Sequence, residues 1–298
     1  MNYFDMHCDT LTEAFRTGQT LRSNRLHIDL LRGSRTGCYA QLFAVFVPDR
    51  MPAAQRWPYA EKILRALGER YRVAHTAEQI KDAIAADGVA VMTAIENGGA
   101  VGENLFLLEE CADFGVKYIT ITWNGVNEWG CGSLSGQSDG LTDVGKQALR
   151  RMEEQNILPD VSHLNERGFW DVMQYAKGPV LATHTASRQV WDHPRNLYDE
   201  QIRAVAATGG LIGLTLYPLH IGDDGYEQAQ HHLERQLRQA GERQVAFGAD
   251  FDGFPTGEEY DGAAVIQGFY QHLSRKGYEP DLLERIFFSN CYDFFTRV

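Results

Sequence analysis

The sequence predicts an α/β protein built as a closed (β/α)₈ barrel. Short apolar runs of strand length, rich in β-branched and aromatic residues, are separated by segments with helical periodicity. The two kinds of segment alternate along the whole chain, which is the pattern of a parallel sheet covered by helices. The length of 298 residues also suits this fold, for which about 250 residues is typical.

Eight apolar runs form the predicted strands. They cover residues 3–8, 38–47, 89–95, 117–122, 157–162, 179–183, 211–216 and 245–249. Segments with helical periodicity and strong helix formers lie between them, among them residues 59–71, 143–155, 166–175, 200–207 and 226–239. Because nearly continuous apolar strands are typical of parallel sheets, we expect helices to cover these strands.

No repeat, low-complexity tract or linker interrupts the chain, so residues 1–298 are expected to form a single domain. A doubly wound open sheet is the alternative architecture for the same alternation. Its usual signature is a glycine-rich dinucleotide or phosphate loop after the first strand, and no such loop follows residues 3–8. The barrel is therefore the preferred prediction.

Composition and charge exclude several classes of partner. The formal net charge of −12, from 28 Lys and Arg against 40 Asp and Glu, would repel nucleic acid. Five scattered cysteines without a Cys-x-x-Cys pair indicate neither a disulfide framework nor a thiolate zinc site. Neither a leader, a lipid-anchor signal nor a run long enough to span a bilayer is recognisable. We therefore expect a cytoplasmic protein without a membrane partner.

Residues of the types that bind metals stand at the carboxyl ends of the predicted strands. They are His7, Asp9, Glu96, His163, His184 and Asp250. In a (β/α)₈ barrel these ends form one face, so side chains far apart in the sequence would meet there. Each position alone has a simpler explanation, such as a helix cap or a hydrogen-bonded structural histidine. Together, two histidines at consecutive strand ends and carboxylates at three others favour a metal site.

Spacing and local context refine these candidates. His7 and Asp9 are two residues apart, so in a strand both side chains would point to the same face. A carboxylate such as Glu96 at the end of a buried strand is costly unless it is paired or metal-bound. Asp250 and Asp252 occur in the sequence GADFDG, which lacks the other ligand positions of a calcium loop. Asp250 is the candidate for chemistry, whereas Asp252 is expected to order the turn.

Seven short segments together resemble the signature blocks of the membrane dipeptidase (renal dipeptidase) family, which belongs to the amidohydrolase superfamily. In order they are DMHCDT (5–10), IENG (95–98), GLT (140–142), DVSH (160–163), THT (183–185), HPRNL (193–197) and GADFDG (248–253). Each is a weak signal alone, but the ordered set covers essentially the whole chain. The resemblance implies a distorted (β/α)₈ barrel that holds two zinc ions.

The resemblance also implies a ligand set. His7 and Asp9 would bind one metal ion, His163 and His184 would bind the other, and Glu96 would bridge both. Imidazole and carboxylate ligands suit zinc independently of the resemblance.

The implied activity is that of a dipeptidase. A hydroxide bridging the two metal ions would attack the amide bond of a small dipeptide-like substrate. Asp250 would act as the acid–base residue, and Arg195 would hold the substrate carboxylate. Family members are often dimers, so a homodimer is a further expectation.

One segment departs from the family pattern. Better-known members carry a substrate-contacting histidine after the fourth strand, where this chain has Trp123 in the sequence TITWNG. Tryptophan cannot accept a hydrogen bond, so Asn124 or Asn127 would take over the contact with the substrate carbonyl, or the substrate would differ. Trp123 would then shape the wall of the substrate site.

Two other functions fit a barrel with this residue set. One is a related binuclear amidohydrolase acting on another small amide, or a deaminase, lactonase or phosphoesterase. Those relatives usually begin with His-x-His, whereas this chain begins with His7-x-Asp9. The other is a binding protein that has lost catalysis, although all the expected ligand and acid–base positions are present.

Overall fold

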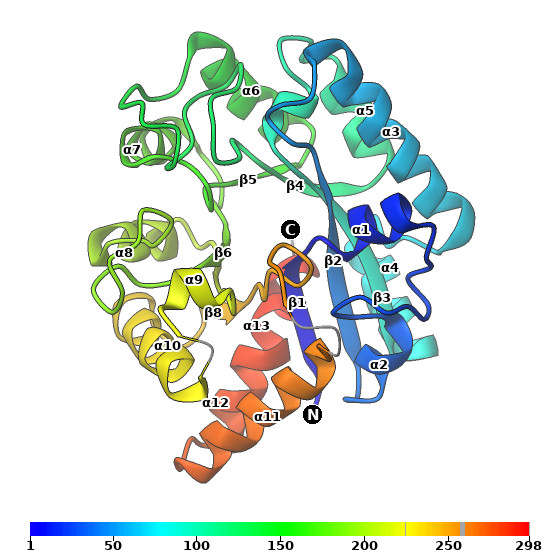
Figure 1. Cartoon of the computed structure of the whole chain (residues 1–298), viewed down its shortest axis with the longest axis vertical. Helices are drawn as coiled ribbons and strands as arrows, with labels where there is room; N and C mark the ends of the chain where they lie inside the picture. The colour runs from blue at the N-terminus through cyan, green and yellow to red at the C-terminus, as the bar shows by residue number, and fades with distance from the viewer. Residues whose placement is uncertain (224, 257–259, 298) are drawn as a thin grey trace.

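Eight parallel strands form one sheet in the computed structural model, which describes residues 1–223, 225–256 and 260–297 (Figure 1). The strands are β1 (Tyr3–Cys8), β2 (Tyr39–Phe46), β3 (Val89–Glu96), β4 (Val116–Thr120), β5 (Leu158–Asp160), β6 (Ala182–Thr185), β7 (Ile212–Leu214) and β8 (Val245–Phe247). Their order is β5-β4-β3-β2-β1-β8-β7-β6. A parallel bridge between Asp160 and Leu181 joins the two ends of this sheet and nearly closes it into a barrel. The predicted (β/α)₈ fold class is confirmed.

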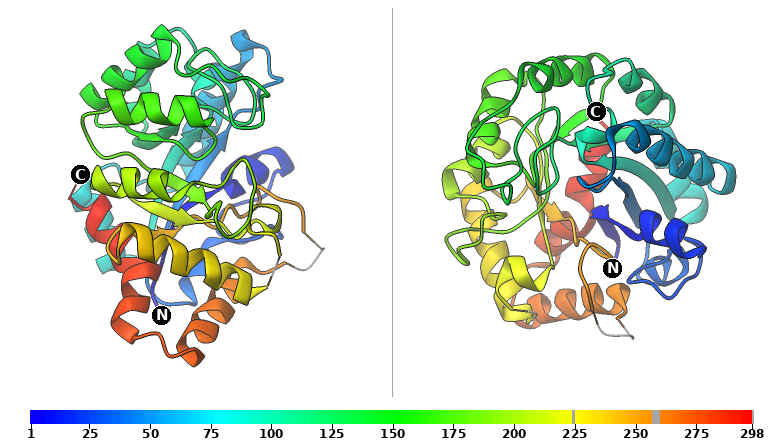
Figure 2. Two further views of the ribbon diagram at one scale, coloured as in Figure 1. Left: turned by 90° about the vertical axis from the view of Figure 1, so that its left-hand side faces the viewer. Right: turned by 45° about the horizontal axis from the view of Figure 1, so that its top comes forward.

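Most helices connect the strands and lie outside the ring that the strands form (Figure 2). They are α1 (Thr10–Thr17), α2 (Leu30–Ser34), α3 (Ala53–Arg70), α4 (Ala77–Asp87), α5 (Leu107–Asp113), α6 (Asp143–Glu154), α7 (Glu166–Tyr175), α8 (Asp199–Ala207), α9 (Pro218–Ile221), α10 (Tyr226–Ala240), α11 (Gly262–Arg275), α12 (Pro280–Glu284) and α13 (Asn290–Phe295), with a 3₁₀ turn η1 (Gly98–Ala100) and a π-helical turn η2 (Arg285–Ser289). Within the described part of the chain, none of the helices has both the length and the apolar character needed to cross a bilayer.

Several boundaries differ from the sequence prediction for identifiable reasons. Helix α3 begins at Ala53, earlier than the predicted range of 59–71, and it includes Pro58, which lacks an amide donor. Strand β6 begins at Ala182, and Pro179 cannot donate a hydrogen bond to a neighbouring strand. Strand β8 ends at Phe247, and soon afterwards the backbone turns into the left-handed region at Asp250, where φ is 65°.

Alternate residues of the strands fill the barrel interior. Phe4, Met6, Leu42 and Met92 belong to one buried cluster, which also includes Phe295 of α13. The rings of Phe4 and Phe295 stack with their centroids 5.6 Å apart. Because side chains alternate between the two faces of a strand, this cluster marks the inward face. The end of the chain therefore packs against the barrel core.

Asp160 links three strands where the barrel closes. Its carboxylate accepts hydrogen bonds from the Thr120 hydroxyl of β4 at 2.7 Å and from the Thr183 amide of β6 at 2.8 Å. It also accepts from the hydroxyl groups of Ser162 and Thr183, at 2.6 and 2.9 Å. The Asp160 side chain is completely buried. This carboxylate therefore reinforces the closure that the single bridge between Asp160 and Leu181 begins.

We predict that Asp160→Ala lowers the free energy of unfolding by about 3 kcal/mol or more, because several buried donors lose their acceptor at about 1–3 kcal/mol each. Urea unfolding of the metal-free protein measures this loss. Asp143→Ala is the matched control, since the Asp143 side chain is 92% exposed. Equal stability of the two variants would show that Asp160 does not reinforce the closure.

Candidate metal centre

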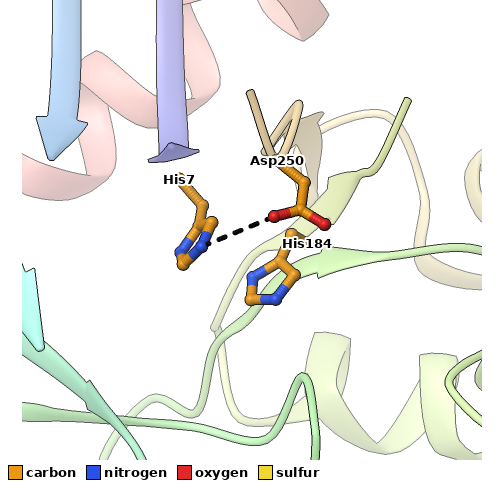
Figure 3. Close-up of side chains that lie close together, drawn as sticks. All are labelled: His7, His184 and Asp250. Atoms are coloured by element: carbon orange, nitrogen blue, oxygen red, sulfur yellow. Dashed lines mark ion pairs between the residues drawn. The ribbon is translucent and has the colours of Figure 1, made fainter. Parts of the chain in front are cut away.

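The six metal-type residues come from five strands or the loops that follow them, and all are buried. His7 lies in β1, Glu96 ends β3 and His184 lies in β6, whereas Asp9, His163 and Asp250 lie just beyond β1, β5 and β8. Figure 3 shows His7, His184 and Asp250 pointing toward one another from different elements. The structure thus brings together residues that are far apart in the sequence.

Glu96 occupies the middle of the cluster. Its Oε1 atom lies 2.8 Å from His163 Nε2 and 3.7 Å from His184 Nε2, and its Oε2 atom lies 3.7 Å from His7 Nε2. Two groups of candidate ligands share this carboxylate. One group consists of Glu96, His163 and His184, and the other of Glu96, His7 and Asp9. Within each group the donor atoms lie within 4.8 Å of one another. The sequence resemblance grouped these candidate residues in the same way.

A third group joins His7 and His184 to Asp250. The imidazole rings of His7 and His184 stack with centroids 3.8 Å apart, and His7 Nε2 lies 3.8 Å from Asp250 Oδ1. Asp250 therefore borders both halves of the cluster.

Hydrogen bonds at the far side of each imidazole determine its tautomer. Tyr118 Oη donates to the Met6 carbonyl, so it accepts the proton of His7 Nδ1, 2.8 Å away. Thr183 Oγ1 donates to Asp160 and likewise accepts from His184 Nδ1 at 2.9 Å.

The third imidazole follows the same pattern. The Asn124 amide oxygen can only accept, and it lies 2.9 Å from His163 Nδ1. All three rings therefore carry the proton on Nδ1 and present the Nε2 lone pair to the centre, as metal-binding histidines commonly do.

This donor set fits metal ions. His7 Nε2, Asp9 Oδ1 and Glu96 Oε2 are buried and have no hydrogen-bond partner in the protein. His163 Nε2 and His184 Nε2 are 2.8 Å apart, although both carry lone pairs. Buried lone pairs and carboxylates that converge without donors are unfavourable unless a cation lies among them. The residues present therefore match a divalent metal centre.

Burial shifts the pKa values of these groups. Burial, together with the charges of Asp9 and Asp250, raises the pKa of Glu96 well above its usual range. Burial raises the pKa of Asp250 to about 7, while the charge of Arg195 opposes that rise. Burial also lowers the pKa of His7 to about 3. The histidines are therefore neutral ligands, and the carboxylates depend on nearby positive charge to ionise.

Arg195 supplies one such charge. Its side chain is 2% exposed, and Nη2 donates to the His184 carbonyl at 3.4 Å. Nε and Nη1 have no partner in the protein. Burial lowers the pKa of Arg195 to about 10, and the charges of Asp250 and Glu96 oppose that effect. At neutral pH it remains a cation with free donors beside the cluster.

Trp123, Asn124 and Asn127 have distinct surroundings. Trp123 is half-buried and packs edge-on against Phe46, with ring centroids 4.9 Å apart. Asn124 Oδ1 lies 2.9 Å from Nδ1 of the His163 ring, so it orients this imidazole. Asn127 donates to Asn97 and to the Ile121 carbonyl and accepts two backbone amides, which leaves no free donor for a substrate.

Other site residues were not recognised in the sequence. Tyr118 and Thr183 orient His7 and His184, but only Thr183 is adjacent to the histidine that it orients. Asp252, expected to order the turn, accepts hydrogen bonds from the Thr10 hydroxyl at 2.5 Å and from the His27 amide at 3.0 Å.

Cavity size alone does not locate this centre. A groove of about 820 Å³ lies at the opposite end of the barrel, lined by Val116, Leu158 and Pro179 near the starts of three strands. In (β/α)₈ enzymes the carboxyl ends of the strands carry the chemistry, and the convergent donor atoms lie there.

The fold and the donor set define the class of metal-dependent hydrolases built on a (β/α)₈ barrel. The family model for membrane dipeptidases (peptidase family M19) matches residues 1–298. The chain therefore belongs to the membrane dipeptidase family, as its sequence blocks had indicated, and this is a family of metallopeptidases.

Similar proteins are found by sequence and by structure. An uncharacterised protein of the pqqA 5′ region from Klebsiella pneumoniae is 30% identical over 240 residues, covering 73% of this chain and 89% of that protein. A crystal structure of a dipeptidase, also a family M19 metallopeptidase, has a TM-score of 0.89 and 25% identity, with 100% of this chain and 98% of that chain covered. A Rhodobacter sphaeroides metallopeptidase bound to a phosphinate mimic of L-Ala-D-Ala has a TM-score of 0.91 and 23% identity, with 100% and 99% covered.

We predict that Tyr118→Phe weakens metal binding by about 10- to 100-fold, because His7 loses the acceptor that holds its ring and tautomer. Competition with a chromophoric chelator measures the affinity. Tyr39→Phe is the control, since Tyr39 is equally buried and its hydroxyl donates to Gln41 instead. An unchanged affinity in Tyr118→Phe would contradict this role.

Proposed function

We propose that this protein hydrolyses the amide bond of dipeptides and uses two divalent metal ions, with zinc as the expected metal. The observation that carries the proposal is the arrangement of two donor groups around one shared carboxylate, Glu96. His7 and Asp9 would hold one ion, and His163 and His184 the other. Two histidines with a carboxylate form a ligand set suited to zinc.

Bound divalent ions would supply Lewis acidity, which lowers the pKa of water toward neutrality and polarises an amide carbonyl. Asp250 is placed to move the proton. Its carboxylate is buried at the edge of the cluster, and a pKa of about 7 suits a group that accepts a proton and then releases it. We assign Asp250 the transfer of a proton from the attacking water to the departing amine.

Arg195 would select the substrate by its free carboxylate. The two unpartnered nitrogen atoms of its guanidinium group are buried beside the cluster. A planar guanidinium can form paired hydrogen bonds with a carboxylate. A carboxyl terminus held so close to the reacting amide would restrict the enzyme to very short peptides.

Trp123 and Phe46 would form an apolar wall of the substrate site. Their edge-on pair lies on the side of His163, whose ring centroid is 6.4 Å from that of Trp123. An aromatic wall excludes water and favours an apolar side chain on the substrate. The same wall could accommodate another small amide, so the substrate panel must extend beyond dipeptides.

The direct test is release of amino acids from a panel of L,L and L,D dipeptides, including L-Ala-D-Ala, together with other small amides. Purified protein is assayed as isolated, after chelation and after zinc is restored. We expect cleavage that disappears on chelation and returns with zinc. Protein that carries two ions but cleaves no dipeptide would refute the proposed function.

We predict that Asp250→Asn lowers kcat by about 10²- to 10⁴-fold, the usual contribution of a positioned acid–base group. Metal content, measured by elemental analysis, should be unchanged. Asp192→Asn is the control, since the Asp192 side chain is 83% exposed in the loop after β6. Near-normal turnover by Asp250→Asn would exclude the assigned role.

We predict that Arg195→Met raises KM for dipeptides by about 10- to 100-fold, since a hydrogen bond to a charged group contributes about 1.5–3 kcal/mol. KM for the corresponding dipeptide amides, which lack the carboxylate, should change much less. Arg188→Met is the control, because Arg188 lies in the same loop and pairs with Asp192. Equal effects on dipeptides and their amides would show that Arg195 does not bind the carboxylate.

A further inference from the structure

Asp49 lies in the loop after β2 and is half-buried. The two oxygens of its carboxylate accept hydrogen bonds from different loops. Oδ1 accepts from Asn97 Nδ2 at 2.8 Å, and Oδ2 accepts from the Gly125 amide at 2.7 Å. One side chain therefore connects the segments that follow β3 and β4.

Both partners adjoin the metal centre. Asn97 directly follows Glu96, the carboxylate shared by the two donor groups. Gly125 directly follows Asn124, whose amide oxygen accepts the proton of His163 Nδ1. The Asp49 carboxylate thus holds the side chain of the residue after Glu96 and the backbone amide of the residue after Asn124.

The backbone at Asn97 needs such support, and the backbone at Gly125 leaves room for the carboxylate. Asn97 has a φ of 91°, which side-chain-bearing residues rarely adopt, so local hydrogen bonds must stabilise this turn. At Gly125 a Cβ atom would lie 2.6 Å from Asp49 Oδ2, so the close approach of the carboxylate requires glycine there. The loop of Asp49 is itself held by Arg56, whose Nη2 donates to the Asp49 carbonyl at 3.3 Å.

We propose that Asp49 is a positioning residue for the metal centre, because its carboxylate holds Glu96 and the Asn124–His163 pair in the geometry that presents their ligand atoms. The inference rests on the proposed metal-dependent function. Outer groups of this kind commonly change metal affinity by about 10- to 100-fold.

An asparagine cannot replace Asp49 in this role. The Asn97 amide group cannot rotate to offer its oxygen, because that oxygen accepts from the Gly99 amide and from Asn127 Nδ2. An asparagine at position 49 that accepts from Gly125 would therefore direct its own NH₂ toward another donor. Asp49→Asn preserves the size of the side chain and removes one hydrogen bond specifically.

The test compares metal affinity in the wild type, Asp49→Asn and the control Asp192→Asn by competition with a chromophoric chelator, using Zn²⁺ as the probe. Asp192 lies in the loop after β6, and its side chain is 83% exposed. We expect about a tenfold or greater loss in Asp49→Asn and less than about twofold in the control. Thermal unfolding of the chelated proteins identifies any general loss of structure.

A double-mutant cycle with Asn97→Gly tests the route of the effect, since glycine tolerates the φ of 91° at this position. If Asp49 acts through Asn97, the losses of metal affinity in the two single variants will not add in the double variant. At saturating Zn²⁺ we expect kcat to fall in Asp49→Asn while KM changes little.

Three results would overturn the proposal: wild-type affinity in Asp49→Asn, an equal loss in Asp192→Asn, or full additivity with Asn97→Gly. Because affinity is measured without substrate, failure of dipeptide hydrolysis would refute the proposed function while leaving the role of Asp49 testable.

Discussion

The rest of the site depends on one constraint: three buried imidazoles direct unprotonated Nε2 atoms at one buried carboxylate. Neutral histidines of this tautomer present only lone pairs to Glu96, whose pKa is raised by burial, and His7 Nε2 and Glu96 Oε2 have no partner in the protein. Such a cluster is stable only around positive charge. The surrounding residues can therefore be understood by how they orient ligands, supply charge or admit a substrate.

The barrel satisfies this constraint with the same contacts that close it. Asp160 joins β4, β5 and β6 and, through the Thr183 hydroxyl, also holds the tautomer of His184. Tyr118 similarly fills the barrel interior while its hydroxyl orients His7. A buried polar group must be hydrogen-bonded. Because the hydrogen bonds of Asp160 and Tyr118 both stabilise the barrel and orient the imidazoles, stability and the geometry of the site are coupled.

The cluster has a positively charged side chain on one side and apolar side chains on another. Arg195 brings a buried cation with free donors to the side of His184, whereas Trp123 and Phe46 lie on the side of His163. A small molecule with a carboxylate at one end and an apolar group at the other would match both. Asp250, with its pKa raised to about 7 by burial, borders His7 and His184.

The sequence alone determined the fold class and indicated the candidate metal-binding residues, because alternating strand and helix signals and polar residues at strand ends are local patterns. It did not determine how those residues reach one another. By simple alternation the His7 side chain would face away from Met6 and the barrel interior. The register of β1 shifts between Asp5 and Cys8, and this irregularity turns the His7 side chain. Asp9 lies outside the strand. The partners that orient the imidazoles, Tyr118 for His7 and Asn124 for His163, are distant in the sequence from the residues that they hold. Only tertiary structure decides such contacts, because a hydrogen bond between distant segments leaves no periodicity or spacing in the chain.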